Sequence, residues 1–138
     1  QTAVPLAQTT GLPISIVDEV AEYDRLSSEY IPIEELRAAN DERWQKLLVG
    51  EWQSDSDTLE SFRNRVISSL EQLIRQHASQ RIVVTCHGGV INQYLAHILG
   101  ISTERGFFYP QYTSIHRVVA SQNGLRSVGS LNEIAHLR

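Results

Sequence analysis

The sequence lacks the features that define several classes of protein. It has a single cysteine among 138 residues, which excludes an internal disulfide framework and favours a reducing compartment. Its net charge is −4 and its Lys and Arg residues are scattered, without the basic stripe of a nucleic-acid-binding surface. No apolar run approaches the roughly 20 residues that span a bilayer, and no signal-peptide pattern is present. We therefore expect a cytoplasmic protein that binds neither nucleic acid nor membrane.

The hydrophobic pattern that is present predicts one globular α/β domain over residues 1–138. Hydrophobic residues make up 41% of the chain, which is long enough to bury a core. Asp57 and Glu60 have the spacing of a capping box, and the apolar residues that follow keep a helical period as far as Ile74. Further elements are expected along the chain: helices at 2–11 and 32–50, a short strand at 14–17, and a hairpin of residues 114–120 and 125–128 around Asn123-Gly124.

The segment Arg81–Val90 is the most informative part of the sequence. Residues 82–84 are consecutive β-branched residues, which are typical of a strand covered on both faces in a parallel sheet. Two glycines follow His87, and they let the backbone turn sharply into a helix whose first N–H groups favour an anion. His87 therefore sits where a phosphate could sit. A backbone-bound histidine is the simpler alternative, and a dinucleotide-binding domain is disfavoured because the Gly-x-Gly-x-x-Gly pattern is missing.

Several motifs occur along the chain in a recognisable order. The predicted strand ends in Cys86-His87-Gly88-Gly89-Val90. The other motifs are Gln1-Thr2-Ala3, Val20-Ala21-Glu22-Tyr23-Asp24, and Leu131-Asn132 with His136-Leu137 after the hairpin. The second of them lies in residues 18–29, called the acidic segment below. Together they span essentially the whole chain, and they resemble the histidine phosphatase superfamily, the phosphoglycerate mutase-like enzymes.

The resemblance implies a fold and an activity. The expected fold is a three-layer, mainly parallel sheet flanked by helices, with the terminal hairpin at or near an edge. A helical cap is expected over about residues 23–57, where Trp44 and Trp52 lie. The implied activity is that of a phosphatase or phosphomutase that acts on a small phosphate monoester through a phosphohistidine intermediate, without a cofactor. The identity of the substrate, and the choice between phosphatase and mutase, stay open.

The resemblance also implies roles for individual residues. His87 would donate hydrogen bonds to the phosphoryl oxygens, and Gly88 would lie against the phosphate. Glu22 is the candidate general acid, which protonates the leaving oxygen and later takes a proton from water. Glu19 competes with it, because like charges in the acidic segment favour a raised pKa at one of them. Arg65 is either a structural or surface residue or, as the lesser alternative, a phosphate contact.

Two other kinds of site are not expected. Cys86 precedes His87, but adjacent strand residues point to opposite faces, so the two should form no catalytic dyad and the thiol should be buried and unreactive. The five histidines show no spacing of a metal site, and we predict no metal. No function is assigned to His116.

The chain departs from the family in one respect. The family's first strand ends in Arg-His-Gly, whose histidine is the nucleophile, and nothing in this sequence matches that motif. The resemblance therefore implies the carboxyl-terminal portion of a longer protein, or a form that has lost the catalytic strand. We expect little or no phosphatase activity from this chain alone, and an exposed strand edge that drives association into a homo-oligomer or leaves the site unformed. The alternative is a non-catalytic module that binds a phosphorylated ligand or a protein.

Overall fold

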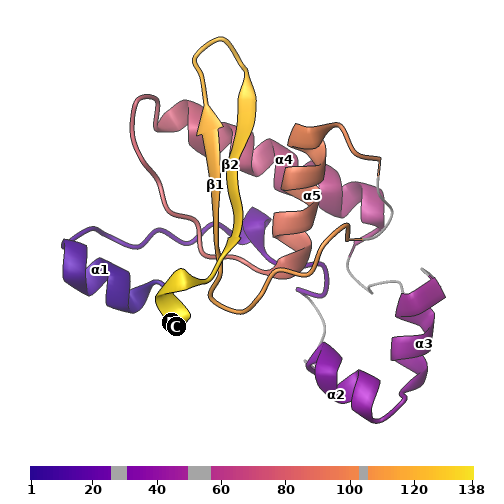
Figure 1. The fold of residues 1–138 in the computed structure, drawn as a ribbon. Coiled ribbons are helices and arrows are strands. Elements are labelled where there is room, and N and C mark those ends of the chain that lie inside the picture. The colour runs from indigo at the N-terminus through magenta and orange to yellow at the C-terminus, as the bar shows by residue number, and fades with distance from the viewer. Residues whose placement is uncertain (26–30, 50–56, 103–105) are drawn as a thin grey trace.

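Two long helices form the centre of the molecule (Figure 1). The computed structural model describes residues 1–25, 31–49, 57–102 and 106–138. Helix α4 (Leu59–Gln76) begins after Thr58, whose hydroxyl accepts a hydrogen bond from the Ser61 N–H at 3.1 Å. The sequence predicts Asp57 as this cap, but the Asp57 carboxylate lies 2.7 Å from Arg65 and leaves the capping position to the next residue.

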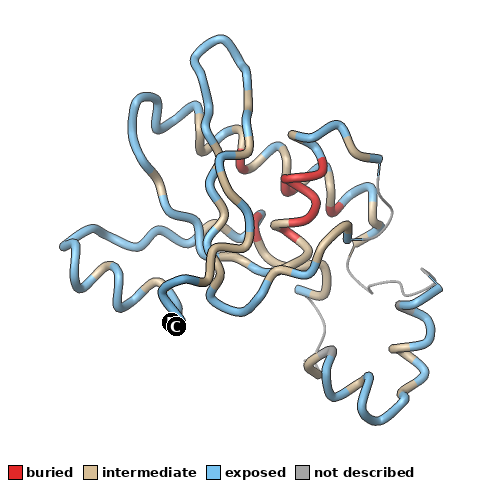
Figure 2. Tube along the Cα trace, viewed as in Figure 1, coloured by how far each residue is buried: buried red, intermediate tan, exposed pale blue. Residues whose placement is uncertain are grey.

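The hydrophobic core lies where α4 meets helix α5 (Gly88–Leu99) and the short 3-10 turn η1 (Asp18–Val20). Figure 2 shows that buried positions concentrate on α5. The core side chains come from all three elements: Phe62, Val66 and Leu70 from α4, Val90 and Tyr94 from α5, and Val20 from η1. Burial of each large apolar side chain contributes about 1.5–3 kcal/mol. The core therefore fixes η1, and with it the start of the acidic segment, against both helices.

A hairpin covers one side of this helical pair. Strand β1 (Ile115–Ala120) pairs antiparallel with β2 (Arg126–Glu133), and Gly124 in the turn has a φ of 91°, which glycine adopts without strain. The predicted hairpin is thus confirmed. Arg126 joins β2 to α4 by donating to both carboxylate oxygens of Glu71, at 3.0 and 2.7 Å.

The predicted parallel sheet is absent from the part of the chain that the structure describes. The sheet there has two strands, both in the hairpin, and residues 12–17 and 81–86 are neither helical nor hydrogen-bonded strand. The side chain of Val83 is 65% exposed and that of Ile16 is 88% exposed, so neither is covered as a buried strand requires. The β-branched pattern favours an extended backbone, but a sheet also requires a neighbouring strand to pair with. The chain is thus an α/β fold with helices and a small two-stranded sheet.

The remaining helices are short. Helix α1 (Val4–Thr10) ends at a left-handed glycine, as predicted. The single helix predicted after residue 32 is two helices, α2 (Ile33–Ala38) and α3 (Glu42–Val49), because the backbone turns at Asn40 with a φ of 49°. Trp52 lies outside the described residues, and the role of this region as a cap stays a prediction. None of the described helices is long and apolar enough to cross a bilayer.

Candidate functional site

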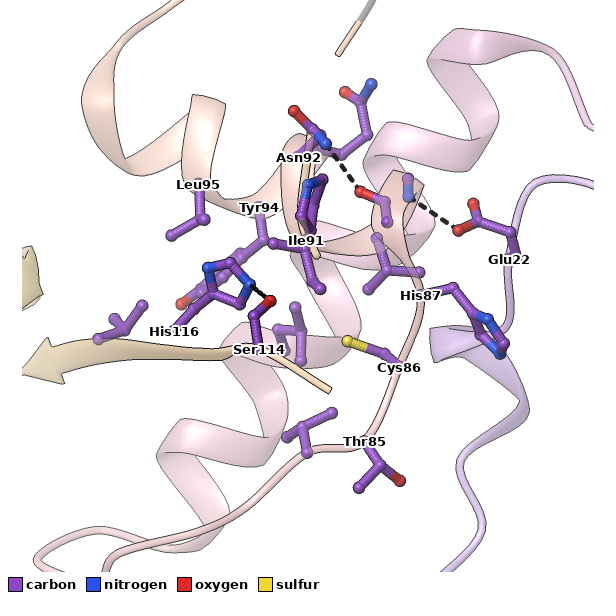
Figure 3. Close-up of a pocket in the computed structure, with 18 of the residues that line it drawn as sticks. Glu22, Thr85, Cys86, His87, Ile91, Asn92, Tyr94, Leu95, Ser114 and His116 are labelled. Carbon is purple, nitrogen blue, oxygen red and sulfur yellow. Dashed lines mark hydrogen bonds between the residues drawn. The ribbon is translucent and has the colours of Figure 1, made fainter. Parts of the chain in front are cut away.

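His87 and Cys86 point to opposite sides of the segment that leads into α5, as the sequence predicts (Figure 3). His87 precedes the first turn of α5 with an extended backbone, φ −118° and ψ 174°, and it is exposed. Cys86 points inward. Burial, with a smaller effect of the Glu22 charge, raises the pKa of its thiol to about 12. The thiol is therefore protonated at neutral pH and does not supply a nucleophile.

Glu22 reaches the first turn of α5 from the acidic segment. Its Oε2 accepts a hydrogen bond from the Gly89 N–H at 2.8 Å (Figure 3). Its Oε1 accepts one from the Tyr23 N–H at 2.8 Å. A Cβ atom on Gly89 would lie 2.1 Å from Oε1, so only glycine leaves room for the carboxylate. The anion position that the sequence predicts here is thus filled by an acidic side chain of the protein itself.

The two acidic candidates differ in their contacts with α5. The side chain of Glu19 is exposed on η1, and its carbonyl oxygen, rather than its carboxylate, is bound by Arg65. Glu22 is the one whose carboxylate contacts the turn that follows His87. Arg65 directs its guanidinium to the backbone of the acidic segment and to Asp57.

Asn92 is a site residue that the sequence analysis misses. It is buried on α5, where its Nδ2 donates to Gly88 O at 2.9 Å and to Phe108 O at 3.2 Å. Its Oδ1 accepts from the Phe107 N–H at 2.9 Å. Asn92 therefore fastens the loop at 106–108 to the first turn of the helix, beside the predicted phosphate-binding glycine. In the sequence, Asn92 is a polar residue among the apolar residues of this helix. A buried polar side chain is nearly always hydrogen-bonded, so this position could have indicated a contact with another segment.

The carboxyl-terminal motif residues hold a second loop. Asn132 accepts a hydrogen bond from the Gln111 N–H at 2.8 Å and donates to Tyr109 O at 3.4 Å. The His136 ring lies 3.0 Å from the carbonyl oxygen of Thr113, and donates to it. Thr113 has a φ of 59°, an unfavourable conformation for a β-branched residue, so the loop relies on these contacts. Through these hydrogen bonds, Asn132 and His136 hold the backbone of the loop between residues 109 and 113.

Ser114 and His116 form a pair that resembles a hydrolytic dyad in composition only. The His116 Nε2 lies 3.0 Å from Ser114 Oγ, while its Nδ1 accepts a hydrogen bond from the Asn132 N–H at 3.2 Å. Since Nδ1 accepts, the proton of the neutral ring is on Nε2 and is donated to the serine. Burial lowers the pKa of His116, against a smaller opposing effect of Glu133, and so favours this neutral form. A ring that donates to the hydroxyl cannot remove its proton, so the pair is structural.

A wide groove lies beside the site. Its volume is about 3350 Å³, and its lining includes Glu22, His87, the segment 81–86 and residues of α4, α5 and β1. Pockets for small ligands are usually about 300–1,000 Å³, so this space is on the scale of a polypeptide segment. Within the described ranges, no three His, Cys, Asp or Glu side chains form a group that could hold a metal ion.

The first turn of a helix commonly binds anions through its free N–H groups, and in this chain the first turn of α5 follows the sequence His87-Gly88-Gly89. A sequence model of the histidine phosphatase superfamily (branch 1) matches residues 1–133, and the chain belongs to this superfamily. No curated protein matches it. Among solved structures, it is similar to a mutant phosphoserine phosphatase from Entamoeba histolytica in complex with phosphoserine, with a TM-score of 0.71 and 21% sequence identity over 96% of this chain and 68% of that one. This likeness supports the fold.

Proposed function

We propose that this chain carries one half of the active site of a phosphatase that hydrolyses a small phosphate monoester. The observation that carries the proposal is the hydrogen bond from the Gly89 N–H to the Glu22 carboxylate at 2.8 Å. Gly89 is two residues beyond His87, so this bond keeps the carboxyl group of Glu22 beside the turn that begins with the histidine. Membership of the histidine phosphatase superfamily supports the same roles.

In the proposed reaction, a second histidine attacks the phosphorus atom through a ring nitrogen, and the bond from phosphorus to the leaving oxygen breaks. Glu22 gives its proton to that oxygen, which leaves as the alcohol. Water then attacks the phosphohistidine, Glu22 takes a proton from the water, and the N–P bond breaks to release phosphate. His87 and the N–H of Gly88 bind the phosphoryl oxygens, whose charge grows in the transition state.

We propose that the second histidine comes from an extended segment outside these 138 residues. Three observations support this. No backbone hydrogen bond joins residues 81–86 to another described residue, Val83 and Val84 are exposed, and the groove beside them has room for a polypeptide strand. A strand that paired with residues 81–86 would form a parallel sheet with them and cover the exposed side chains of Val83 and Val84.

The substrate is proposed at the level of a small phosphate monoester. The similar solved structure contains phosphoserine, which is such an ester, and this supports a substrate of that size. The proposed chemistry is hydrolysis by transfer of the phosphoryl group to water. A mutase would instead return the phosphoryl group to a second hydroxyl of the substrate.

The experiment compares the 138-residue chain with the protein expressed from its complete reading frame, using an aryl phosphate as substrate. We expect turnover only from the complete protein. There, His87→Ala should lower kcat by about 10²–10³-fold, the usual effect of losing one donor to a developing charge. Glu22→Gln should lower it by about 10²–10⁴-fold, the range for general acid catalysis. His97→Ala, which removes an exposed histidine in the last turn of α5, is the matched control and should have no effect.

Two results would contradict the proposal. Full activity of both the His87→Ala and Glu22→Gln variants would remove the assigned roles. Turnover by the 138-residue chain alone, abolished by His87→Ala, would show that the chain carries a whole site rather than half of one. Binding of inorganic phosphate without turnover in either form would instead favour the non-catalytic module.

A further inference from the structure

Arg65 of α4 binds the backbone of the acidic segment through several carbonyl groups at once. Its Nη1 donates to Glu19 O at 2.7 Å and to Ala21 O at 2.9 Å. Its Nη2 donates to Glu22 O at 3.4 Å and to Asp57 Oδ2 at 2.7 Å. A guanidinium group can do this because its donors lie in one plane in a fixed fork. One side chain of α4 thus holds the main chain on both sides of the bend that leads to Glu22.

The guanidinium is itself held in place by Asp57. The side chains of Arg65 and Asp57 are only 12% and 7% exposed, so their ion pair is largely shielded from water. Burial would raise the pKa of Asp57, but the hydrogen bond and charge of Arg65, together with Ser61 and Arg25, lower it below its ordinary value. The guanidinium also lies over the Phe62 ring, 5.2 Å from its centre. The pair is therefore fixed and charged at neutral pH.

The geometry excludes a phosphate contact for Arg65 as it stands. Both terminal nitrogens are engaged by the protein, and Nε is buried without a hydrogen-bond partner among the described residues. A bound phosphate would have to displace a main-chain carbonyl or Asp57. Glu22, by contrast, is held at both ends. Arg65 donates to its carbonyl oxygen, and the N–H groups of Gly89 and Tyr23 donate to its carboxylate.

We propose that Arg65 is a positioning residue for Glu22, which keeps the carboxylate in contact with the first turn of α5. The inference rests on the proposed function, in which Glu22 is the general acid. Arg65 would act only through Glu22 and would not touch the substrate. Lysine cannot replace it, because a single ammonium group lacks the planar fork that reaches three carbonyls and a carboxylate together.

The Gly89 amide provides a direct measurement, because it donates to the Glu22 carboxylate. We expect its ¹H and ¹⁵N chemical shifts to follow the ionisation of Glu22 in a pH titration of the 138-residue chain. In Arg65→Lys, the amplitude of this titration should fall at least twofold. Arg126→Lys is the matched control, since the Arg126 side chain is also 12% exposed and also binds a carboxylate. That carboxylate belongs to Glu71, away from the acidic segment. Arg126→Lys should leave the Gly89 titration unchanged.

The outcomes separate positioning from general stabilisation. An unchanged Gly89 titration in Arg65→Lys would overturn the proposal, and so would an equal loss in Arg126→Lys, which would indicate nonspecific loosening. If Arg65→Lys does not fold, Asp57→Asn keeps the shape of the pair while removing its negative charge. Asp57→Asn should reduce the amplitude of the Gly89 titration, and an unaltered amplitude in this variant would likewise overturn the proposal.

Kinetics of the complete protein provide a second measurement. Arg65→Lys should lower kcat at least tenfold with KM changed less than twofold, and it should add nothing when Glu22 is already Gln. Additive effects of the two substitutions would contradict a role through Glu22. If Glu22→Gln leaves turnover unchanged, the proposed function fails, whereas the Gly89 titration still decides whether Arg65 positions the carboxylate.

Discussion

The contact between Glu22 and Gly89 can be tested by adding one methyl group. In Gly89→Ala, the new Cβ would lie 2.1 Å from Glu22 Oε1 and 2.9 Å from its carboxyl carbon. The φ of Gly89 is not in the left-handed region, so alanine causes no backbone strain there. The flexible end of Glu22 must therefore move away, which breaks its hydrogen bond to the Gly89 N–H.

The expected cost follows from the interactions lost and gained. A hydrogen bond to a charged group contributes about 1.5–3 kcal/mol. A carboxylate at a helix N-terminus adds about 0.3–1 kcal/mol. Alanine in place of glycine returns about 0.5–1 kcal/mol of helix stability. Because Glu22 is only half-buried, we take the lower part of these ranges, and the free energy of unfolding should fall by about 1–2 kcal/mol.

A double-mutant cycle makes the test specific. In a Glu22→Ala background the clash is gone, so Gly89→Ala should stabilise the chain by about 0.5–1 kcal/mol, which reverses the sign of its effect. Gly88→Ala is the control, because a Cβ there would meet only Pro110, at 3.9 Å. Urea denaturation followed by circular dichroism measures all of these variants. The reasoning is refuted if Gly89→Ala is stabilising in the original chain, or if its cost is the same when Glu22 is alanine.

Three further predictions concern residues around the site. Asn92→Ala leaves the Phe107 N–H without its acceptor and should lower the free energy of unfolding by about 1–3 kcal/mol in urea; no change would count against its role. Cys86, with a pKa of about 12 against the usual 9.0, should react with iodoacetamide at pH 8 about a thousandfold more slowly when folded than when unfolded, and equal rates would contradict its burial. The hydrogen bond from Arg126 lowers the pKa of Glu71 below its ordinary value of 4.5. The ionised Glu71 therefore makes its full contribution to the free energy of unfolding above pH 4.5. This contribution is lost as the pH falls through the lower pKa of the folded state. Glu71→Gln should therefore cost about 1–3 kcal/mol at pH 7, and a cost independent of pH would oppose this account.

The sequence alone determined the parts of the fold that depend on neighbours along the chain. The helical period predicted α4, and Asn123-Gly124 predicted the hairpin, because both depend on contacts within a few residues. The alternation of side chains along an extended segment predicted that Cys86 and His87 point apart. The resemblance of scattered motifs identified the superfamily.

The parallel sheet marks the limit of this kind of prediction. Consecutive β-branched residues at 82–84 favour an extended backbone, and the segment is not helical. Pairing, however, is a property of two segments, and residues 81–86 pair with no other segment that the structure describes. The pattern therefore predicted the conformation of the segment and not its partner.

Only the tertiary structure decided the contacts that assemble the candidate site. The Glu22 carboxylate, and not that of Glu19, accepts a hydrogen bond from Gly89. Arg65 binds main-chain carbonyl groups that are far from it in sequence. Local patterns in a sequence predict the structures that depend on interactions between residues close in sequence. Which distant groups meet is set by how α4, α5 and η1 pack, because the core fixes all three elements in one arrangement and so brings the acidic segment to the first turn of α5.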